Sequence, residues 1–118
     1  MINSFRDLTV WQRAIELTKT TYKICQSLPK EELFGLVAQM KRSAISVPSN
    51  IAEGSRRQTL KEYQQFLYIA LGSISELETQ YEIAYQLDFI NKNTYDNCLE
   101  KIQVIGKMLR KLIVSLKG

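Results

Sequence analysis

The strongest constraint on this chain is the spacing of its apolar residues, which recur every three or four positions with few interruptions. One part of the chain holds this spacing in Tyr63, Leu67, Ala70, Ile74, Leu77, Tyr81 and Ala84. The last part repeats it in Tyr95, Cys98, Ile102, Ile105, Leu109, Leu112 and Leu116. Such spacing places apolar side chains on one face of a helix. No segment shows the alternation of apolar and polar residues that is typical of a strand. The sequence therefore predicts an all-α fold.

Two prolines and five glycines divide the 118 residues into four expected helices. Pro29 is expected to end the first helix, because proline disfavours helix in the residue before it. Pro48 lies inside the second helix and should kink it, and Gly54 should close it in a left-handed conformation. Thr59 and Glu62 predict a capping box at the start of the third. The expected helices cover residues of about 7–28, 32–53, 60–87 and 94–116.

Short connections make neighbouring helices antiparallel, so we predict an up-and-down four-helix bundle that spans residues 1–118 as one domain. Strict three-four spacing favours a shallow left-handed crossing. The expected core face of the first helix is Leu8, Trp11, Ile15, Thr18, Tyr22 and Cys25, and that of the second is Leu33, Val37, Met40, Ala44, Val47 and Ile51. The first helix also has a second apolar stripe, formed by Val10, Ala14, Leu17, Ile24 and Leu28.

The chain has no histidine, and its two cysteines, Cys25 and Cys98, are far apart. Hydrolase triads usually need an imidazole base, and zinc needs a cluster of cysteines and histidines. The glycines are scattered, so no phosphate-binding loop is present. We therefore expect no enzyme, no metal and no cofactor, with a carboxylate-based site around Glu53 and Arg42 as the remaining enzymatic alternative. The absence of a long apolar run and of a signal-peptide layout indicates a cytoplasmic protein without a membrane partner.

The third expected helix has more apolar surface than one core face needs, and positions 63–75 hold no charged residue. A helix that is apolar nearly all round is usually buried on several sides. Gly72 lowers helix propensity, which is easier to accept where another backbone approaches closely. We therefore expect copies of the chain to associate, and the alternative is a thicker core within one bundle. The candidate oligomer interface is Phe66, Tyr68, Ile69, Leu71, Gly72 and Ser73.

A line of polar residues runs beside the core face of the second expected helix. Charges near a core are seldom left unpaired, so Glu76 and Glu78 of the antiparallel third helix are expected partners for Arg42. The predicted polar network is Gln39, Arg42, Asn50, Glu53, Glu76 and Glu78. A functional pocket built on Arg42, Asn50 and Glu53 is the alternative.

The net charge of +4 is unevenly distributed. Positions 41–61 and 101–118 are rich in basic residues, whereas positions 76–100 are rich in acidic ones. A solvated basic face is the simplest explanation, but such a surface can also hold phosphate backbones without reading their sequence. No motif for base-specific recognition is present. The candidate nucleic-acid contacts are Arg56, Arg57, Lys61, Arg110 and Lys111.

Several motifs resemble those of the four helix bundle protein family, which is also described as the family of 23S ribosomal RNA intervening-sequence proteins. The most distinctive is Ser46-Val47-Pro48-Ser49-Asn50-Ile51-Ala52-Glu53-Gly54. Further matches are Leu8-Thr9-Val10-Trp11-Gln12, Phe34-Gly35-Leu36 and Glu76-Leu77-Glu78-Thr79. The resemblance covers residues 5 to about 87. It departs at Lys41-Arg42-Ser43, where two arginines followed by alanine are expected.

The resemblance implies a short antiparallel bundle that assembles into a five-fold ring. Relatives that accompany diversity-generating retroelements look like basic rings that bind nucleic acid and the reverse transcriptase. The leading hypothesis is therefore a non-enzymatic homopentamer that binds structured RNA or DNA without sequence specificity. The alternative is a scaffold that docks a partner enzyme, such as a reverse transcriptase, without touching nucleic acid itself.

Overall fold

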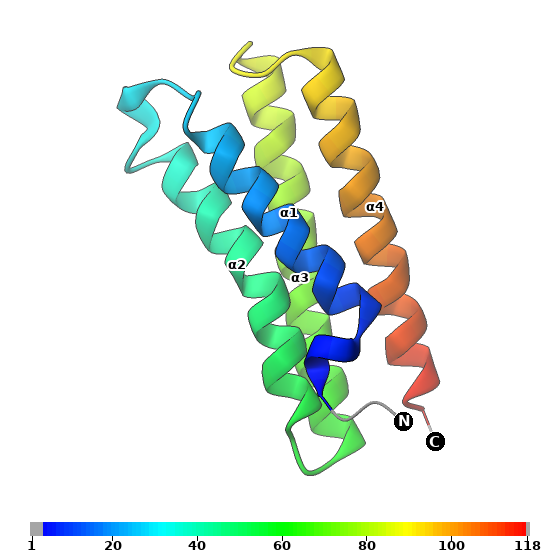
Figure 1. Cartoon of the computed structure of the whole chain (residues 1–118). Coiled ribbons are helices and arrows are strands. Elements are labelled where there is room, and N and C mark those ends of the chain that lie inside the picture. Colours follow the sequence, from blue (N-terminus) through cyan, green and yellow to red (C-terminus); the bar gives the residue numbers. More distant parts are fainter. Residues whose placement is uncertain (1–3, 118) are drawn as a thin grey trace.

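Four helices form an antiparallel bundle in the computed structural model, which describes residues 4–117 (Figure 1). They are α1 (Thr9–Cys25), α2 (Leu36–Ser55), α3 (Leu60–Gln86) and α4 (Lys92–Ser115). Single-turn 3-10 helices, η1 (Phe5–Asp7) and η2 (Lys30–Glu32), precede α1 and α2. Residues 4–117 contain no strand. The prediction of an all-α four-helix bundle is confirmed.

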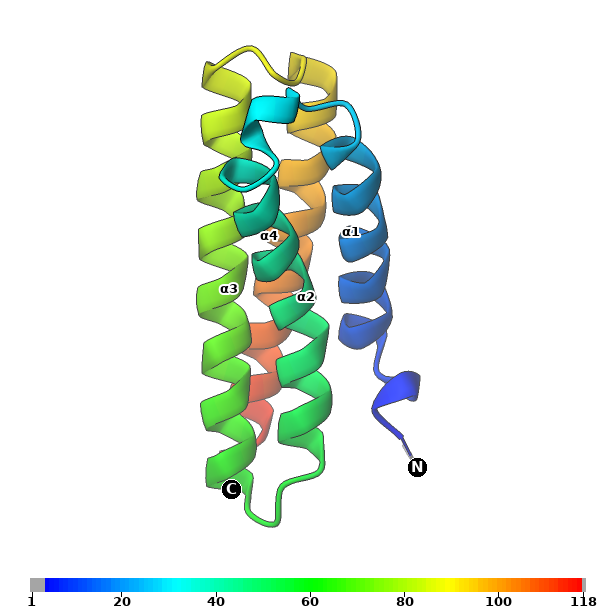
Figure 2. The ribbon, with the colours of Figure 1, turned by 90° about the vertical axis from the view of Figure 1, so that its left-hand side faces the viewer.

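Contacts between neighbouring helices fix their opposite directions. In the middle of the bundle, the Ser73 hydroxyl of α3 donates to the Ser46 hydroxyl of α2 over 2.8 Å. The Gln64 side-chain amide of α3 donates to the Ile113 carbonyl of α4 over 3.0 Å. The 3-10 helix η1, the end of α4 and the α2–α3 connection therefore lie at the same end of the bundle (Figures 1 and 2).

The core faces of α2, α3 and α4 follow the predicted spacing closely. Most of the core residues that were expected in these three helices are buried, namely Val37, Met40, Ala44, Val47, Ile51, Leu67, Ala70, Ile74, Leu77, Tyr81, Ala84, Cys98, Ile102, Ile105 and Leu109. Leu33 is wrong as a core residue, because it precedes α2 and is half exposed. Near the end of α4 the core position is Ile113, whereas Leu112 is only partly buried.

The predicted core face of the first helix is confirmed only in part. Cys25 is buried, and Leu8 and Trp11 pack partly buried against the core. Ile15, Thr18 and Tyr22 are not core residues. The structure buries the second stripe, with Val10, Ala14 and Leu17 in the core. The expected face runs along α2 instead, where the Thr18 hydroxyl donates to the Ala44 carbonyl over 3.0 Å. A buried polar pair accompanies this orientation, because the Thr21 and Tyr81 hydroxyls lie 2.7 Å apart. Buried hydroxyls need a partner, so rotating α1 to the predicted face would leave Tyr81 without this one.

The ends of α2 also differ from the prediction. The helix begins at Leu36 rather than near residue 32, because residues 30–32 form the separate turn η2 and the backbone of Gly35 is not helical (φ −110°, ψ −108°). Gly54 does not close the helix in a left-handed conformation, since no glycine in residues 4–117 has a positive φ. It lies within the last turn of α2, against α3. Pro48 is buried inside the helix, which continues to Ser55.

The starts of α3 and α4 have side-chain caps. The Thr59 hydroxyl accepts from the Glu62 backbone N–H over 3.1 Å and donates to the Glu62 carboxylate over 2.9 Å. The predicted cap is therefore present, although the carboxylate accepts from a hydroxyl rather than from the backbone. Helix α4 starts slightly earlier than expected, because Asn91 caps it by accepting from the Thr94 N–H over 2.8 Å. Local capping thus places residues 56–61 at a defined position at the end of the bundle.

Candidate functional site

The five candidate nucleic-acid contacts come from two chain segments that the antiparallel fold brings toward the same end. Arg56, Arg57 and Lys61 lie in and beside the α2–α3 connection, and Arg110 and Lys111 lie in the last part of α4 (Figure 1). All five side chains are exposed. The structure therefore gathers cations that are about fifty positions apart in the sequence.

Two of these arginines are held by aromatic rings. The Arg57 guanidinium lies 4.6 Å from the centre of the Phe66 ring and pairs with the Glu53 carboxylate. The Arg56 guanidinium lies 5.0 Å from the centre of the Phe5 ring and forms no ion pair within residues 4–117. A cation over an aromatic face is attracted by the ring quadrupole. These contacts restrict both guanidiniums while leaving them in contact with solvent.

The cations of α4 occupy two flanks of that helix. Arg110 and Lys107 line a groove between α3 and α4, together with Glu78. Lys111 lines a different groove, between the start of α1 and α4. The predicted contacts therefore share one end of the bundle but do not form a single flat face.

The two ends of the bundle differ in charge. We call the end that holds residues 4–8, 53–64 and 107–117 the basic end. The basic side chains in these ranges are Arg6, Arg56, Arg57, Lys61, Lys107, Arg110, Lys111 and Lys117, against the acidic Asp7, Glu53 and Glu62. The opposite end carries the acidic side chains Glu31, Glu32, Glu82, Asp88, Asp96 and Glu100, against the basic Lys23, Lys30 and Lys92. The electrostatic potential therefore differs between the two ends of the bundle.

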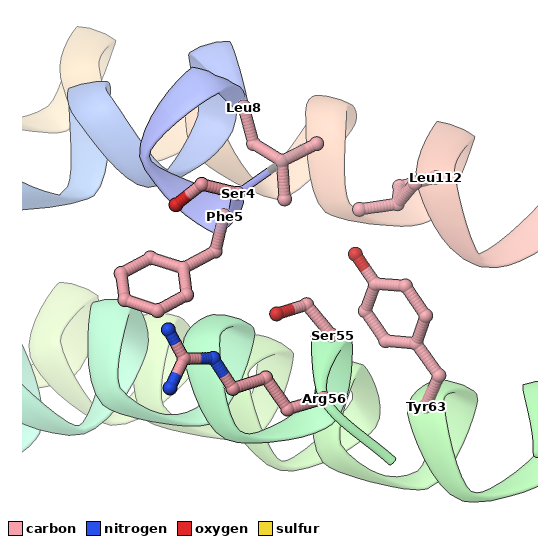
Figure 3. A pocket seen from close by; sticks show the side chains of 7 residues that line it. All are labelled: Ser4, Phe5, Leu8, Ser55, Arg56, Tyr63 and Leu112. Atoms are coloured by element: carbon pink, nitrogen blue, oxygen red, sulfur yellow. The ribbon is translucent and has the colours of Figure 1, made fainter. Parts of the chain in front are cut away.

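A cavity of about 400 Å³ lies at the basic end (Figure 3). Its lining comes from η1, α2, α3 and α4, and consists of Ser4, Phe5, Leu8, Ser55, Arg56, Tyr63 and Leu112. Neither this cavity nor its residues Ser4 and Phe5 were predicted from the sequence. The one local signal in this region is Ser4, a typical capping residue, which caps η1 by accepting from the Arg6 N–H over 3.2 Å.

The predicted polar network separates into local contacts. The Asn50 side-chain amide donates to the Ser46 carbonyl and hydroxyl over 2.8 and 2.9 Å. Ser46 also accepts from Ser73, so these three residues connect α2 with α3. Glu53 instead pairs with Arg57, four positions further along the chain. The network that joins α2 to α3 is therefore built mainly from serines rather than from charged residues.

Arg42 forms no ion pair with Glu76 or Glu78 in the described part of the chain, so the expected pairing is wrong. Its side chain is exposed, and water can solvate it without a carboxylate. Gln39 and Glu76 line a shallow groove between α2 and α3 that also includes Gln80. The Gln80 side-chain oxygen is buried there without a hydrogen-bond partner from residues 4–117.

The candidate oligomer interface is only partly exposed. Tyr68 and Ile69 are 54% and 52% exposed on the outer side of α3, and a Cβ added at Gly72 would have no heavy atom within 4 Å. Phe66 and Leu71 are partly buried. Ser73 is buried inside the bundle against α2. The open surface is therefore centred on Tyr68, Ile69 and Gly72.

Other surface features bear on function. Phe34, in the turn before α2, is 92% exposed, and sequence reasoning did not single it out as a surface residue. Within residues 4–117, no three histidine, cysteine, aspartate or glutamate side chains are grouped in a way that could hold a metal ion. None of the helices in this part of the chain combines the length and hydropathy needed to cross a membrane.

Comparison with known proteins supports this architecture. The sequence model of the 23S rRNA-intervening sequence protein family matches residues 6–111. A crystal structure of a protein of unknown function from the S23 ribosomal protein family of Bacteroides thetaiotaomicron superposes with a TM-score of 0.81. That protein is 24% identical, and the match covers 89% of this chain and 98% of the other, which shows a shared fold. No curated protein matches the chain.

Proposed function

Because the chain belongs to the 23S rRNA-intervening sequence protein family, we propose that it is a non-enzymatic homo-oligomer that binds structured RNA or DNA through its basic end. The observation that carries this proposal is the position of Arg56, Arg57, Lys61, Arg110 and Lys111, which two separate chain segments bring to one end of the bundle. Polyanions are the ligands that such a concentration of exposed cations attracts most strongly.

Binding at this end is directed at phosphate rather than at bases. When protein cations replace the counterions of a nucleic acid, the affinity of the complex depends on salt concentration and not on the base sequence. Exposed guanidiniums and ammonium groups suit this role, because they can follow the spacing of phosphates. The resulting protein recognises the shape and charge of a nucleic acid and does not discriminate its bases.

The proposed oligomer is the five-fold ring that the family resemblance implies. An exposed apolar surface centred on Tyr68 and Ile69 supports association, since neighbouring apolar side chains that are half exposed gain free energy when a second copy covers them. Gly72, about one turn further along α3, leaves space for a close approach. In a ring with its axis along the helices, the basic ends of all copies lie on the same side.

Two matched double variants test the role of the basic end. Lys61→Gln with Lys111→Gln removes two charges there, and Lys23→Gln with Lys30→Gln removes two exposed charges from the other end. Fluorescence anisotropy of a structured RNA and a duplex DNA is measured with nuclease-treated protein over a range of salt concentrations. We expect the first variant to bind more weakly, with a salt slope smaller by about 2 if both lysines contact phosphates.

The second variant should bind as the wild type does. Equal weakening in both variants would mean that net charge alone matters, which contradicts a site at the basic end. Absence of binding by the wild type at low salt would contradict direct nucleic-acid binding altogether and would favour the scaffold that docks a partner enzyme.

A further inference from the structure

We propose that the cavity at the basic end binds a nucleoside monophosphate, either as a free mononucleotide or as the phosphorylated end of a nucleic-acid strand. The choice of a nucleotide as the ligand rests on the proposed function, whereas the preference for an anion comes from the cavity itself. The cavity lies between η1, the end of α2, the start of α3 and the last part of α4 (Figure 3).

Among residues 4–117, the charged lining of the cavity is a single arginine. Arg56 lines it, and no aspartate or glutamate of this part of the chain does. The guanidinium has no carboxylate partner within residues 4–117. Phe5 holds it at 5.0 Å from the ring centre, and the Arg6 guanidinium lies 4.8 Å from the centre of the same ring. A positioned guanidinium can donate two parallel hydrogen bonds to phosphate oxygens, so the cavity is suited to a phosphate group.

Hydroxyl groups supply further donors in the lining of the cavity. The Tyr63 hydroxyl points into the cavity and forms no hydrogen bond with another residue of the described chain (Figure 3). Burial raises the pKa of Tyr63, so this hydroxyl keeps its proton at neutral pH. The Ser4 oxygen accepts from the Arg6 N–H, which leaves its own proton available. The Tyr63 and Ser4 hydroxyls can therefore each donate a hydrogen bond to a ligand that fills the cavity.

The rest of the lining suits the sugar and base of a nucleotide. Leu8, Leu112 and the Tyr63 ring provide apolar surface. The Ser55 hydroxyl donates to the Ala52 carbonyl over 2.7 Å, so its oxygen is left to accept from a ligand N–H or O–H. A volume of about 400 Å³ exceeds what an inorganic phosphate would fill and lies in the range of small-ligand sites. An anion attached to a larger, partly apolar group is the chemistry that this lining recognises.

Calorimetric titration of the full chain tests the proposal. The probes are adenosine and uridine 5′-monophosphate, with adenosine and inorganic phosphate as partial ligands. We expect the monophosphates to bind saturably and both partial ligands to bind more weakly. Arg56→Gln should weaken monophosphate binding by about tenfold or more, because it removes charge-assisted hydrogen bonds. Tyr63→Phe should weaken monophosphate binding by a smaller factor. Because this variant keeps the aromatic ring, it still tests the proposal if Arg56→Gln fails to fold.

Lys117→Gln is the matched control, because Lys117 is an exposed cation of the same end that does not line the cavity. It should leave monophosphate binding unchanged. Equal losses in Arg56→Gln and Lys117→Gln, or no saturable binding of either monophosphate, would overturn the proposal. If duplex binding with its salt dependence remains in that case, the proposed function stands without the cavity. If the monophosphates bind but neither duplex DNA nor structured RNA does, the cavity stands and the proposed function fails.

Oligonucleotides with a 5′-phosphate or a 5′-hydroxyl distinguish the two sources of the ligand. If only the 5′-phosphorylated strand competes with adenosine monophosphate, the result supports a strand end as the ligand. Competition by neither strand supports a free mononucleotide. Equal competition by both strands would show that the terminal phosphate is not recognised, which contradicts the proposal.

Discussion

Gly54 of α2 lies so close to Phe66 of α3 that a Cβ at position 54 would be 2.8 Å from the Phe66 Cβ. It would also lie 3.0 Å from Cδ1 and 3.2 Å from the carbonyl oxygen of Tyr63. A glycine is therefore required by the approach of two helices rather than by backbone conformation. This contact sets how closely α2 and α3 approach beside the cavity at the basic end.

Replacing Gly54 should destabilise the fold by about 1 to 3 kcal/mol, because Gly54→Ala forces α2 and α3 apart. Gly72→Ala is the matched control, since its new methyl group meets nothing within the chain. In dilute protein it should stabilise α3 by about 0.5 to 1 kcal/mol through helix propensity. Urea unfolding followed by circular dichroism measures both. Similar changes for the two variants would contradict the close approach at Gly54.

The buried hydroxyl pair of Thr21 and Tyr81 should show strong coupling in a double-mutant cycle. Thr21→Val leaves the Tyr81 hydroxyl without this partner and is expected to cost about 1 to 3 kcal/mol of stability. The double variant Thr21→Val with Tyr81→Phe should lose less than the sum of the two single variants. Additive losses would mean that the 2.7 Å contact does not contribute to stability.

The contact between Tyr95 of α4 and Glu82 of α3 predicts a pH dependence. The Tyr95 hydroxyl donates to the Glu82 carboxylate over 2.5 Å, which lowers the pKa of Glu82 and raises the pKa of Tyr95 to about 12. The Glu82 contribution is present above the ordinary glutamate pKa and is lost as the pH falls through the lowered value. The Tyr95 contribution is present below the ordinary tyrosine pKa and is lost as the pH rises from there toward 12.

Tyr95→Phe should therefore be less stable than the wild type near neutral pH, and the two should converge in acid. Chemical unfolding of both proteins from pH 3 to 7 measures this difference. Glu82→Gln is a second variant whose stability should depend less on pH over the same range. A constant gap between wild type and Tyr95→Phe at every pH would contradict a charge-assisted hydrogen bond.

The apolar outer surface of α3 should control self-association. Ile69→Glu places a charge among half-exposed apolar side chains and is expected to shift the protein toward the monomer in light scattering. Val114→Glu is the control, because Val114 is 62% exposed but lies on α4. It should leave the mass of the particle unchanged. A wild-type protein that is a folded monomer in dilute buffer would contradict the proposed ring.

Most of the helices and core could be predicted from the sequence, because their signals are local. In α3 and α4 the three-four spacing continues without a break along the whole helix, and the Thr59 cap depends only on neighbouring residues. The core face of α1 could not be predicted, because two apolar stripes compete there. Packing chose the stripe with Ala14 and Leu17, and the buried Thr21 hydroxyl found Tyr81 sixty positions away.

The candidate site was likewise predicted only in part from the sequence. Its cations were identified from charge distribution alone, and the antiparallel connections explain why Arg57 and Lys111 reach the same end. The expected pairing of Arg42 with Glu76 or Glu78 was wrong, because helix register alone does not bring exposed side chains together when water solvates them equally well.

By itself, the sequence determined that this protein consists of amphipathic helices and that its charge is concentrated in certain segments, because helix periodicity, capping and charge are properties of neighbouring residues. Only the tertiary structure decided which face of α1 is buried, why Gly54 has to be a glycine, and how Ser4, Arg56 and Tyr63 come to enclose one cavity. Those features depend on contacts between distant parts of the chain, whose geometry follows from how side-chain shapes pack rather than from any local pattern.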